Sequence, residues 1–144
     1  MKTSLVFGTF DAIHPGHEYF LEQAHHYGQR LVVVVARDRF VNSYKNKKPL
    51  HDEISRLHFI QKHKLVTEAC LADEELGTFS VLDKIRPDYI CLGHDQDALA
   101  ESLKSWMSAS GNHYHIKRIK PFERHKYSST LLNRLKRHKH SEQK

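Results

Sequence analysis

Residues 31–35 (LVVVV) form an apolar run with no polar residue in it, and four of the five are valine. β-branched residues of this kind favour extended strands. A strand that is apolar at every position has to be covered on both faces, which is the situation of a central strand in a parallel sheet. The run therefore predicts a parallel sheet with helices packed on both sides.

Shorter apolar runs and helical patterns alternate along the rest of the chain. We expect further strands at 4–7, 65–71, 89–92 and 114–119, and helices at 18–27, 52–62, 81–85, 99–107 and 129–137. This alternation predicts an α/β fold, a single Rossmann-like open parallel sheet of about five strands with helices on both faces. Such sheets bind ligands beyond the carboxyl ends of their strands, so the residues after Phe7, Ala36 and Leu92 are the first candidates for a site.

Two of the expected helices carry clear signals. The helix at 18–27 is followed by Gly28, a residue that commonly ends helices. The helix at 52–62 carries Ile54, Leu57 and Ile60 at helical spacing, and we expect this stripe to face the sheet.

The composition fits one folded domain. A chain of 144 residues corresponds to a single domain, and we expect residues 1–135 to form it and residues 136–144 to be a frayed, polar, basic tail. No apolar run reaches the roughly 18 residues that a membrane-spanning helix needs. The two cysteines lack a CxxC spacing, which argues against a disulfide framework or a cysteine-rich zinc site and favours the reducing cytoplasm.

The chain is basic, with a net charge of +6 and 13 histidines in addition. A basic protein is expected to bind anions, which can be nucleic acid, an acidic surface or small phosphorylated substrates. Composition alone does not show which of these three kinds of anion the protein binds. The positions of the charges along the sequence are needed to distinguish them.

Residues 7–17 (FGTFDAIHPGH) lie between the first strand and the first helix, where a phosphate-binding turn would lie. Pro15 suits a first helical position, and Gly16 lets a ligand approach the backbone closely. His14 and His17 are three residues apart and can point the same way. Two imidazoles beside the free N–H groups of a helix start would bind phosphate oxygens. The alternative is that His14 is a loop residue and His17 an ordinary helix-face residue.

This stretch resembles the signature of the cytidylyltransferase-like nucleotidyltransferases, in the string GTFD at 8–11 and the box His14-x-Gly16-His17. The resemblance extends from Ser4 to about Leu135. Two branches look closest, the archaeal-type FAD synthases, which are FMN adenylyltransferases, and the glycerol-3-phosphate cytidylyltransferases. The strings VARD (35–38), KKP (47–49), RPD (86–88) and LGHDQ (92–96) are similar to the first branch, and the Trp typical of the second branch near 95–96 is absent.

The resemblance implies transfer of a nucleoside monophosphate from a nucleoside triphosphate to a phosphorylated alcohol, with release of pyrophosphate. The closer branch implies ATP and FMN giving FAD, and the alternative is CTP with glycerol-3-phosphate or a similar phosphoalcohol. The attacking phosphate oxygen is already ionised near neutral pH, so the site has to align two polyanions and stabilise charge rather than supply a base. A non-catalytic nucleotide- or nucleic-acid-binding module is a further alternative, but it gives these motifs no joint purpose.

The resemblance also implies roles for individual residues. His14 and His17 would contact the triphosphate and stabilise the transition state, with Lys47 as a third catalytic residue. The expected nucleotide-binding residues are Thr9, Phe10, His14, Pro15, Gly16, His17, Asp95, Arg124, Ser128, Ser129 and Thr130. The expected substrate-binding residues are Asp11, Asp38, Lys45, Lys47 and Arg56.

Several of these residues have a plainer interpretation. Residues 45–48 (KNKK) can be a solvated basic loop. Asp38 can orient a substrate hydroxyl or pair with a basic neighbour, and Arg56 can be a surface arginine or form a helix-to-helix salt bridge.

The string RHKYSST at 124–130 opens the last expected helix. Its hydroxyls and free N–H groups suit the β- and γ-phosphates, although a simple helix cap would look the same. The string resembles the family's second signature and departs from it twice. Lys126 stands where Gly is common, and Arg124 is one residue closer to Ser128 than usual.

The cofactor and partners follow from this assignment. No remaining histidine has a zinc-ligand pattern, so we expect no protein metal site and Mg²⁺ bound through the nucleotide phosphates. We expect small-molecule substrates, the nucleoside triphosphate and a phosphorylated alcohol such as FMN, and no nucleic-acid or membrane partner. The resemblance implies a homodimer.

Overall fold

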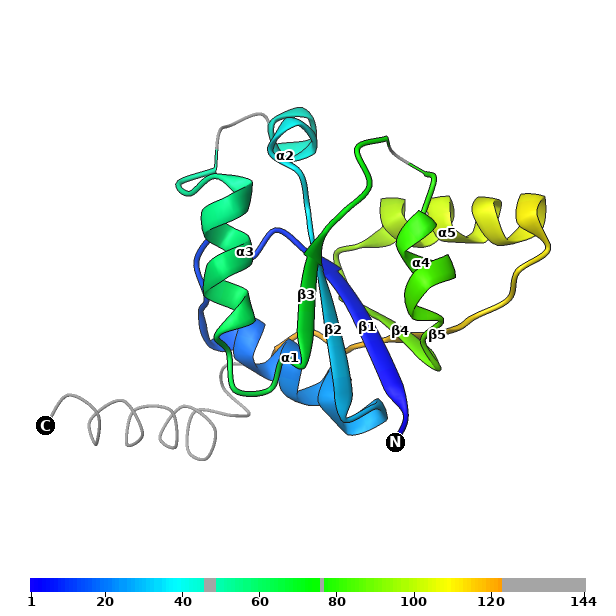
Figure 1. The fold of residues 1–144 in the computed structure, drawn as a ribbon, viewed down its shortest axis with the longest axis horizontal. Helices are drawn as coiled ribbons and strands as arrows, with labels where there is room; N and C mark the ends of the chain where they lie inside the picture. The colour runs from blue at the N-terminus through cyan, green and yellow to red at the C-terminus, as the bar shows by residue number, and fades with distance from the viewer. Residues whose placement is uncertain (46–48, 76, 123–144) are drawn as a thin grey trace, which may run out of the picture.

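The computed structural model describes residues 1–45, 49–75 and 77–122. Its centre is one sheet of five parallel strands in the order β3-β2-β1-β4-β5 (Figure 1). The strands are β1 (Thr3–Gly8), β2 (Arg30–Val35), β3 (Glu68–Leu71), β4 (Tyr89–Leu92) and β5 (His115–Arg118). The helices are α1 (Pro15–Tyr27), α2 (Asp38–Lys45), α3 (Glu53–Gln61), α4 (Ser80–Ile85) and α5 (Asp97–Ser110). The α/β fold expected from the sequence is confirmed.

The strand order reverses between β1 and β4. The chain moves outward from β1 to β2 and β3, and then returns to add β4 and β5 on the other side of β1. A crevice forms at such a reversal, outside the carboxyl ends of the strands. The topology therefore places the expected site next to the end of β1.

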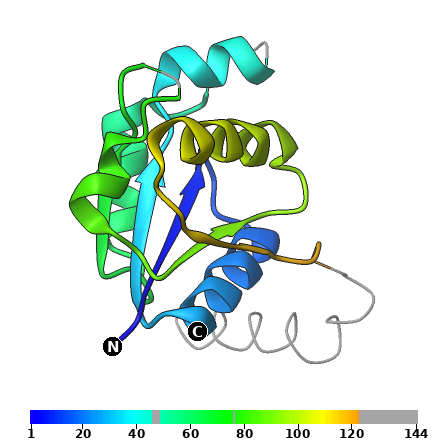
Figure 2. The same cartoon turned by 90° about the vertical axis from the view of Figure 1, so that its right-hand side faces the viewer.

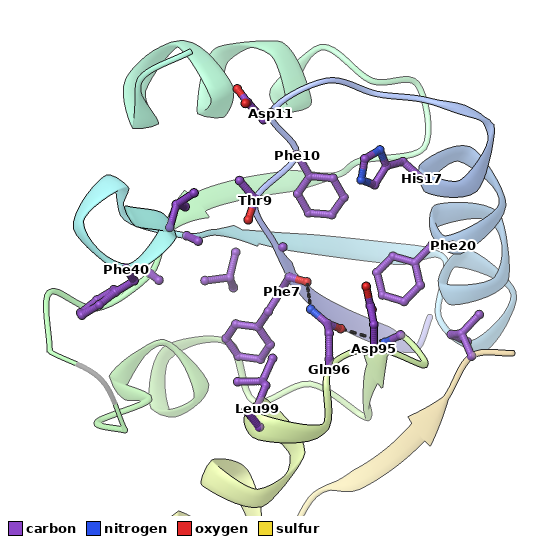
Figure 3. A pocket seen from close by; sticks show the side chains of 18 of the residues that line it. Phe7, Thr9, Phe10, Asp11, His17, Phe20, Phe40, Asp95, Gln96 and Leu99 are labelled. Atoms are coloured by element: carbon purple, nitrogen blue, oxygen red, sulfur yellow. Dashed lines mark hydrogen bonds between the residues drawn. The ribbon is translucent and has the colours of Figure 1, made fainter. Parts of the chain in front are cut away.

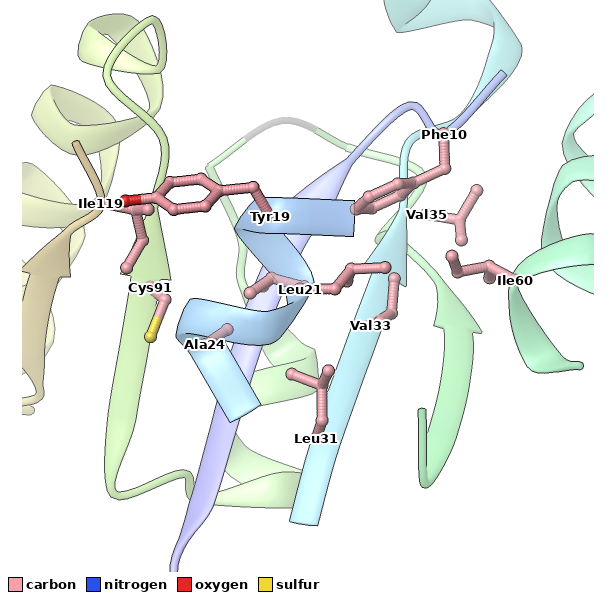
Figure 4. Close-up of a cluster of buried hydrophobic side chains, with 11 residues drawn as sticks. Phe10, Tyr19, Leu21, Ala24, Leu31, Val33, Val35, Ile60, Cys91 and Ile119 are labelled. Atoms are coloured by element: carbon pink, nitrogen blue, oxygen red, sulfur yellow. The ribbon is translucent and has the colours of Figure 1, made fainter. Parts of the chain in front are cut away.

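The residues of β2 alternate between two hydrophobic clusters. Leu31, Val33 and Val35 pack with residues of α1 and α3, as Figure 4 shows. Val32 and Val34 pack with residues of α4 and α5 on the other face. All five side chains are fully buried, so the prediction of a strand covered on both sides is confirmed. Figure 2 shows the same layers from the side.

Several element boundaries differ from those expected. α1 begins at Pro15, three residues before the expected start, because His14 caps the helix. β3 begins three residues later than expected, since the amide of Val66 donates to the carbonyl of His63 and turns the chain there. The expected helix at 129–137 and the expected tail lie outside the described residues.

One helix was missed. Residues 38–45 form α2, beyond the carboxyl end of β2 (Figure 1). Lys45 is therefore the last residue of a helix and not part of a loop, and Asp38 is the first residue of that helix. The spacing of Phe40, Val41 and Tyr44 is a helical signal that the basic residues after it obscured.

The apolar stripe expected on α3 is partly wrong. Ile60 is buried and Leu57 is half-buried, but Ile54 is 49% exposed. The fully buried side chain in the first turns of this helix is Arg56. Polar groups from two neighbouring segments meet Arg56, and its burial turns Ile54 toward solvent. Among the described residues, no helix is long and apolar enough to cross a membrane.

Candidate active site

A cavity of about 700 Å³ lies along the carboxyl edge of the sheet. Residues at or just after the end of every strand line it: Gly8, Ala36, Ala72, Gly93 and Ile119. Its volume is within the range of about 300–1,000 Å³ that is usual for small-molecule sites. The cavity is where the topology predicts a ligand site, and Figure 3 shows it from close by.

The signature turn after β1 is tightly packed. Phe10 has a φ of +52°, in the left-handed region, and its side chain is buried. Its ring lies over Gly8, where an added Cβ would come within 2.5 Å of the ring. The same ring lies 5.6 Å from the imidazole of His17, measured between centroids. Gly8 therefore has to lack a side chain for Phe10 to reach His17.

His14 and His17 lie together at the start of α1, with ring centroids 3.8 Å apart. Nδ1 of His14 accepts a hydrogen bond from the amide of Gly16 at 3.1 Å, and Nδ1 of His17 accepts one from the amide of His14 at 3.3 Å. A neutral imidazole that accepts at Nδ1 carries its proton on Nε2. Both rings line the cavity. The amide of Gly16, expected to be free for phosphate, is capped here by His14.

Asp11 lines the cavity and also holds the segment before α3. Its carboxylate accepts hydrogen bonds from the amides of Leu50 at 2.7 Å and His51 at 2.9 Å. Burial alone would raise the pKa of Asp11, but these hydrogen bonds outweigh it and lower the pKa below its ordinary value. Asp11 is therefore a stable carboxylate that already has partners within the protein.

Arg56 connects three segments from inside the protein. Its guanidinium donates to the carbonyl of Thr9 at 2.8 Å and, at 2.6 Å, to the carboxylate of Asp38. Its Nε donates to the carbonyl of His51 at 3.1 Å. The ion pair between α3 and α2 is the helix-to-helix bridge considered as an alternative for this residue. Neither Arg56 nor Asp38 is among the residues that line the cavity.

A second exchange of hydrogen bonds joins α2 to α3. The amide of Asp38 donates to the Glu53 carboxylate at 2.9 Å, and the amide of Glu53 donates to the Asp38 carboxylate at 3.1 Å. Arg37 adds an ion pair to Glu53 at 3.0 Å. Each helix start is thus capped by an acid from the other, and this exchange ties α3 to α2, which contributes Phe40 and Val41 to the cavity lining.

Gln96 lies in the string 92–96 that the sequence interpretation singled out, but no role was predicted for it. Its side-chain amide donates to the carbonyl of Phe7 at 2.9 Å and accepts from the amide of Gly93 at 2.8 Å. Through these two hydrogen bonds, its side chain links the ends of β1 and β4, where the strand order reverses. Its place in the string 92–96 was a signal, because a glutamine amide both donates and accepts.

The proposed residues fall into three groups. Those lining the cavity are Thr9, Phe10, Asp11, His14, Gly16, His17 and Asp95. Those described but outside its lining are Pro15, Asp38 and Arg56. The side chain of Lys45, together with Lys47, Arg124, Ser128, Ser129 and Thr130, lies outside what the structure describes.

The comparisons with known proteins identify the family. The family model described as cytidylyltransferase-like matches residues 5–135. An FAD synthase of Ferroglobus placidus is 42% identical over 123 residues, which are 85% of this chain and 79% of that protein. An FAD synthase of Methanothermobacter thermautotrophicus is 38% identical over 133 residues, which are 90% of this chain and 87% of that protein.

Two solved structures are also similar. A lipopolysaccharide core biosynthesis protein from Thermoplasma volcanium has a TM-score of 0.77 and 35% identity, covering 85% of this chain and 99% of that chain. A pantoate-β-alanine ligase from Francisella tularensis, complexed with β-γ ATP and β-alanine, has a TM-score of 0.55 and 12% identity, covering 85% of this chain and 60% of that one. The second likeness shows the fold alone. From its family signature, its five-stranded parallel sheet and these matches, the chain belongs to the cytidylyltransferase-like family.

Proposed function

We propose that this protein transfers the adenylyl group of ATP to FMN, giving FAD and pyrophosphate. The observation that carries this proposal is the run of relatives named FAD synthase, which are 37–42% identical to this chain over most of both lengths. The cavity supports it, since it lies at the carboxyl edge of the sheet and contains the paired histidines of the signature turn.

The reaction needs charge stabilisation more than proton transfer. An oxygen of the FMN phosphate attacks the α-phosphorus of ATP, and the bond from that phosphorus to the bridging oxygen of the β-phosphate breaks. The electron pair of that bond leaves with pyrophosphate. Because the attacking phosphate is already ionised near neutral pH, no general base is required.

His14 and His17 suit this chemistry. Their Nε2–H groups would donate to oxygens of the α-phosphate as charge builds up on them. The caps at Nδ1 hold both rings in one orientation, so little reorganisation is needed during the reaction.

The remaining residues divide by position. We assign Thr9, Phe10, Pro15, Gly16 and Asp95 to the nucleotide. Asp11, Asp38 and Arg56 would contribute to substrate binding indirectly. They would do so by holding the signature turn and the segment before α3 in position. Lys45, Lys47, Arg124, Ser128, Ser129 and Thr130 stay predictions as phosphate ligands.

We propose that a divalent cation enters with the nucleotide. Within the described residues there is no group of three or more His, Cys, Asp or Glu side chains that could hold a metal ion. Phosphate oxygens are the ligands that Mg²⁺ prefers. The ion would neutralise charge on the β- and γ-phosphates, and EDTA should then abolish turnover until Mg²⁺ is restored.

We also propose a cytoplasmic homodimer. Cys70 and Cys91 are free thiols, and burial raises the pKa of Cys91 to about 12, so that it stays neutral and unreactive. Free thiols suit a reducing compartment.

The homodimer is a separate prediction that comes from the family resemblance. Sedimentation equilibrium at micromolar concentration would test it by measuring the mass of the particle.

One assay tests the reaction and its alternatives together. The purified protein is incubated with Mg²⁺ and each pairing of ATP or CTP with FMN or glycerol-3-phosphate, and pyrophosphate is measured alongside FAD. We expect both products from ATP and FMN only. Turnover of CTP with glycerol-3-phosphate would replace the proposal by the cytidylyltransferase alternative, and no pyrophosphate from any pairing would favour a binding module.

A further inference from the structure

The sheet splits between β1 and β4 at its carboxyl edge. β1 pairs with β2 as far as Gly8, and β4 pairs with β5 as far as Leu92. β1 and β4 pair with each other only as far as Val6 and Cys91, so this ladder stops two residues before the end of β1. The signature turn leaves on one side of the split and residues 93–96 leave on the other. The two segments that face each other across the site therefore diverge here.

The register shows which ladder bond is missing at the split. In a parallel ladder a carbonyl accepts from the amide one residue beyond its register partner, as Gly8, level with Val35, accepts from Ala36 at 2.9 Å. By the same pattern, the next bond between β1 and β4 would run from the amide of Gly93 to the carbonyl of Phe7. These two groups are the ones that any device holding the split has to satisfy.

The side-chain amide of Gln96 takes the place of this bond (Figure 3). Its Nε2 donates to the carbonyl of Phe7 at 2.9 Å, and its Oε1 accepts from the amide of Gly93 at 2.8 Å. Two hydrogen bonds with an amide group between them thus replace one direct bond. The strand ends are kept apart, and neither backbone group loses a partner, which would be unfavourable in the interior.

Arg118 holds the β4 side of the split from the other direction. Its guanidinium donates to the carbonyl of Gly93 at 3.1 Å and to that of His94 at 3.2 Å. It also forms an ion pair with Asp97 at 2.8 Å. Because the amide of Gly93 is bound by Gln96 and its carbonyl by Arg118, this residue is held on both sides.

On the β1 side, the position of Phe7 affects the paired histidines. Phe7 is followed by Gly8 and the turn in which the buried ring of Phe10 lies 5.6 Å from the imidazole of His17. A shift of the Phe7 carbonyl would therefore displace the turn that supports His17. The proposed reaction has to align two polyanions with this ring, and a misplacement of about 1 Å can lower the rate roughly 100-fold.

Resting on the proposed function, we propose that Gln96 is a positioning residue for nucleotidyl transfer. Its side-chain amide sets the distance between the signature turn, which carries the paired histidines, and residues 93–96. The cavity extends across the split, since Gly8 and Gly93 both line it. A side chain of another length or without the amide changes the width of the split, so that substrates held on one side are no longer aligned with the histidines on the other.

Two variants test this role through the kinetics of FAD formation. Gln96→Met keeps the length of the side chain and removes both hydrogen bonds, whereas Gln96→Asn keeps the amide and is one methylene shorter. We expect kcat to fall about 100-fold in the first and at least about tenfold in the second, with the KM values for ATP and FMN unchanged within about threefold.

Gln61 offers a matched control. Its side-chain amide also reaches a strand carbonyl, that of Ala69 at 3.5 Å, but it is not among the residues that line the cavity. The variants Gln61→Met and Gln61→Asn should keep the wild-type kcat.

Hydrogen exchange of the Gly93 amide, followed by NMR, gives a readout that needs no turnover. We expect Gln96→Met to speed exchange of this amide at least about tenfold while the amides inside β1 and β4 keep their wild-type rates. A general loss of stability would instead speed exchange across the whole sheet.

The outcomes separate this proposal from the proposed function. If the wild-type protein makes no FAD, the proposed reaction is wrong, and the exchange of the Gly93 amide still tests whether Gln96 holds the split. Wild-type kcat in Gln96→Met, a loss of activity that lies wholly in KM, or unchanged exchange at Gly93 would overturn the assignment.

Discussion

The imidazole of His14 uses its two nitrogens for different purposes. Nδ1 accepts the amide hydrogen bond of Gly16 and so caps α1. Nε2 carries the proton that the proposed mechanism directs at phosphate. One residue therefore caps a helix and, in the proposed mechanism, also donates to the phosphate, and a suitable substitution can separate the two roles.

Replacing His14→Asn should keep the cap and remove the donor. The asparagine oxygen accepts the same amide hydrogen bond, because Asn is among the best residues at this helix position. We expect kcat to fall about 100-fold or more, with a change of less than about 0.5 kcal/mol in the free energy of unfolding. Steady-state kinetics and urea denaturation measure the two quantities. His14→Ala is the control and should lose the same activity and about 1 kcal/mol in addition. Wild-type turnover in His14→Asn would contradict the role of this ring.

At the scale of secondary-structure elements, two polar contacts hold the helices around the site. Arg56 joins α3 to α2 and to the signature turn. Glu18 joins α1 to the segment after α3, through His63 at 2.9 Å. Both contacts join elements that are far apart in the sequence.

The variant Arg56→Met should destabilise the protein markedly. Methionine fills similar space but leaves the carbonyls of Thr9 and His51 and the carboxylate of Asp38 without their donor. Because Asp38 is still 34% exposed, we expect a loss of about 2–3 kcal/mol in the free energy of unfolding, below the range for a fully buried pair. Urea denaturation measures it. Arg30→Met breaks an exposed pair with Glu68 and should cost less than about 1 kcal/mol. Equal losses in the two variants would contradict the bracing role of Arg56.

The contact between Glu18 and His63 predicts a dependence of stability on acid pH. The hydrogen bond from His63 lowers the pKa of Glu18 below its ordinary value of 4.5, with the charges of His63 and Lys64 adding to the effect. A carboxyl whose pKa is lowered by folding stabilises the protein above the unfolded pKa, and the contribution disappears as the pH falls through the lowered value. We expect Glu18→Gln to be less stable than wild type at pH 7, with the difference shrinking below pH 4.5. Urea denaturation at several pH values between 7 and 3 measures it, and a difference that stays constant with pH would rule out this linkage.

At the scale of the whole molecule, the sheet and the place of the cavity were predictable from the sequence. The strand at 31–35 is apolar at every position, and the alternation of strands and helices leaves few parallel topologies. The turn between Gly8 and His17 was predictable as a site because its glycines, proline and histidines lie within one short segment. α2 was missed because its helical spacing is short and ends in a basic run.

The amino-acid sequence by itself determined the strand positions, the signature turn and the family, since each depends on residues that are neighbours along the chain. Only the tertiary structure decided that Arg56 is buried against Thr9 and that Gln96 links the ends of two strands. The partners in these contacts are 47 residues apart for Arg56 and Thr9 and 89 apart for Gln96 and Phe7. Periodicity describes which residues share a face of one element. It does not say which polar group of a distant element that face will meet, because this depends on how the packed helices and strands are finally placed.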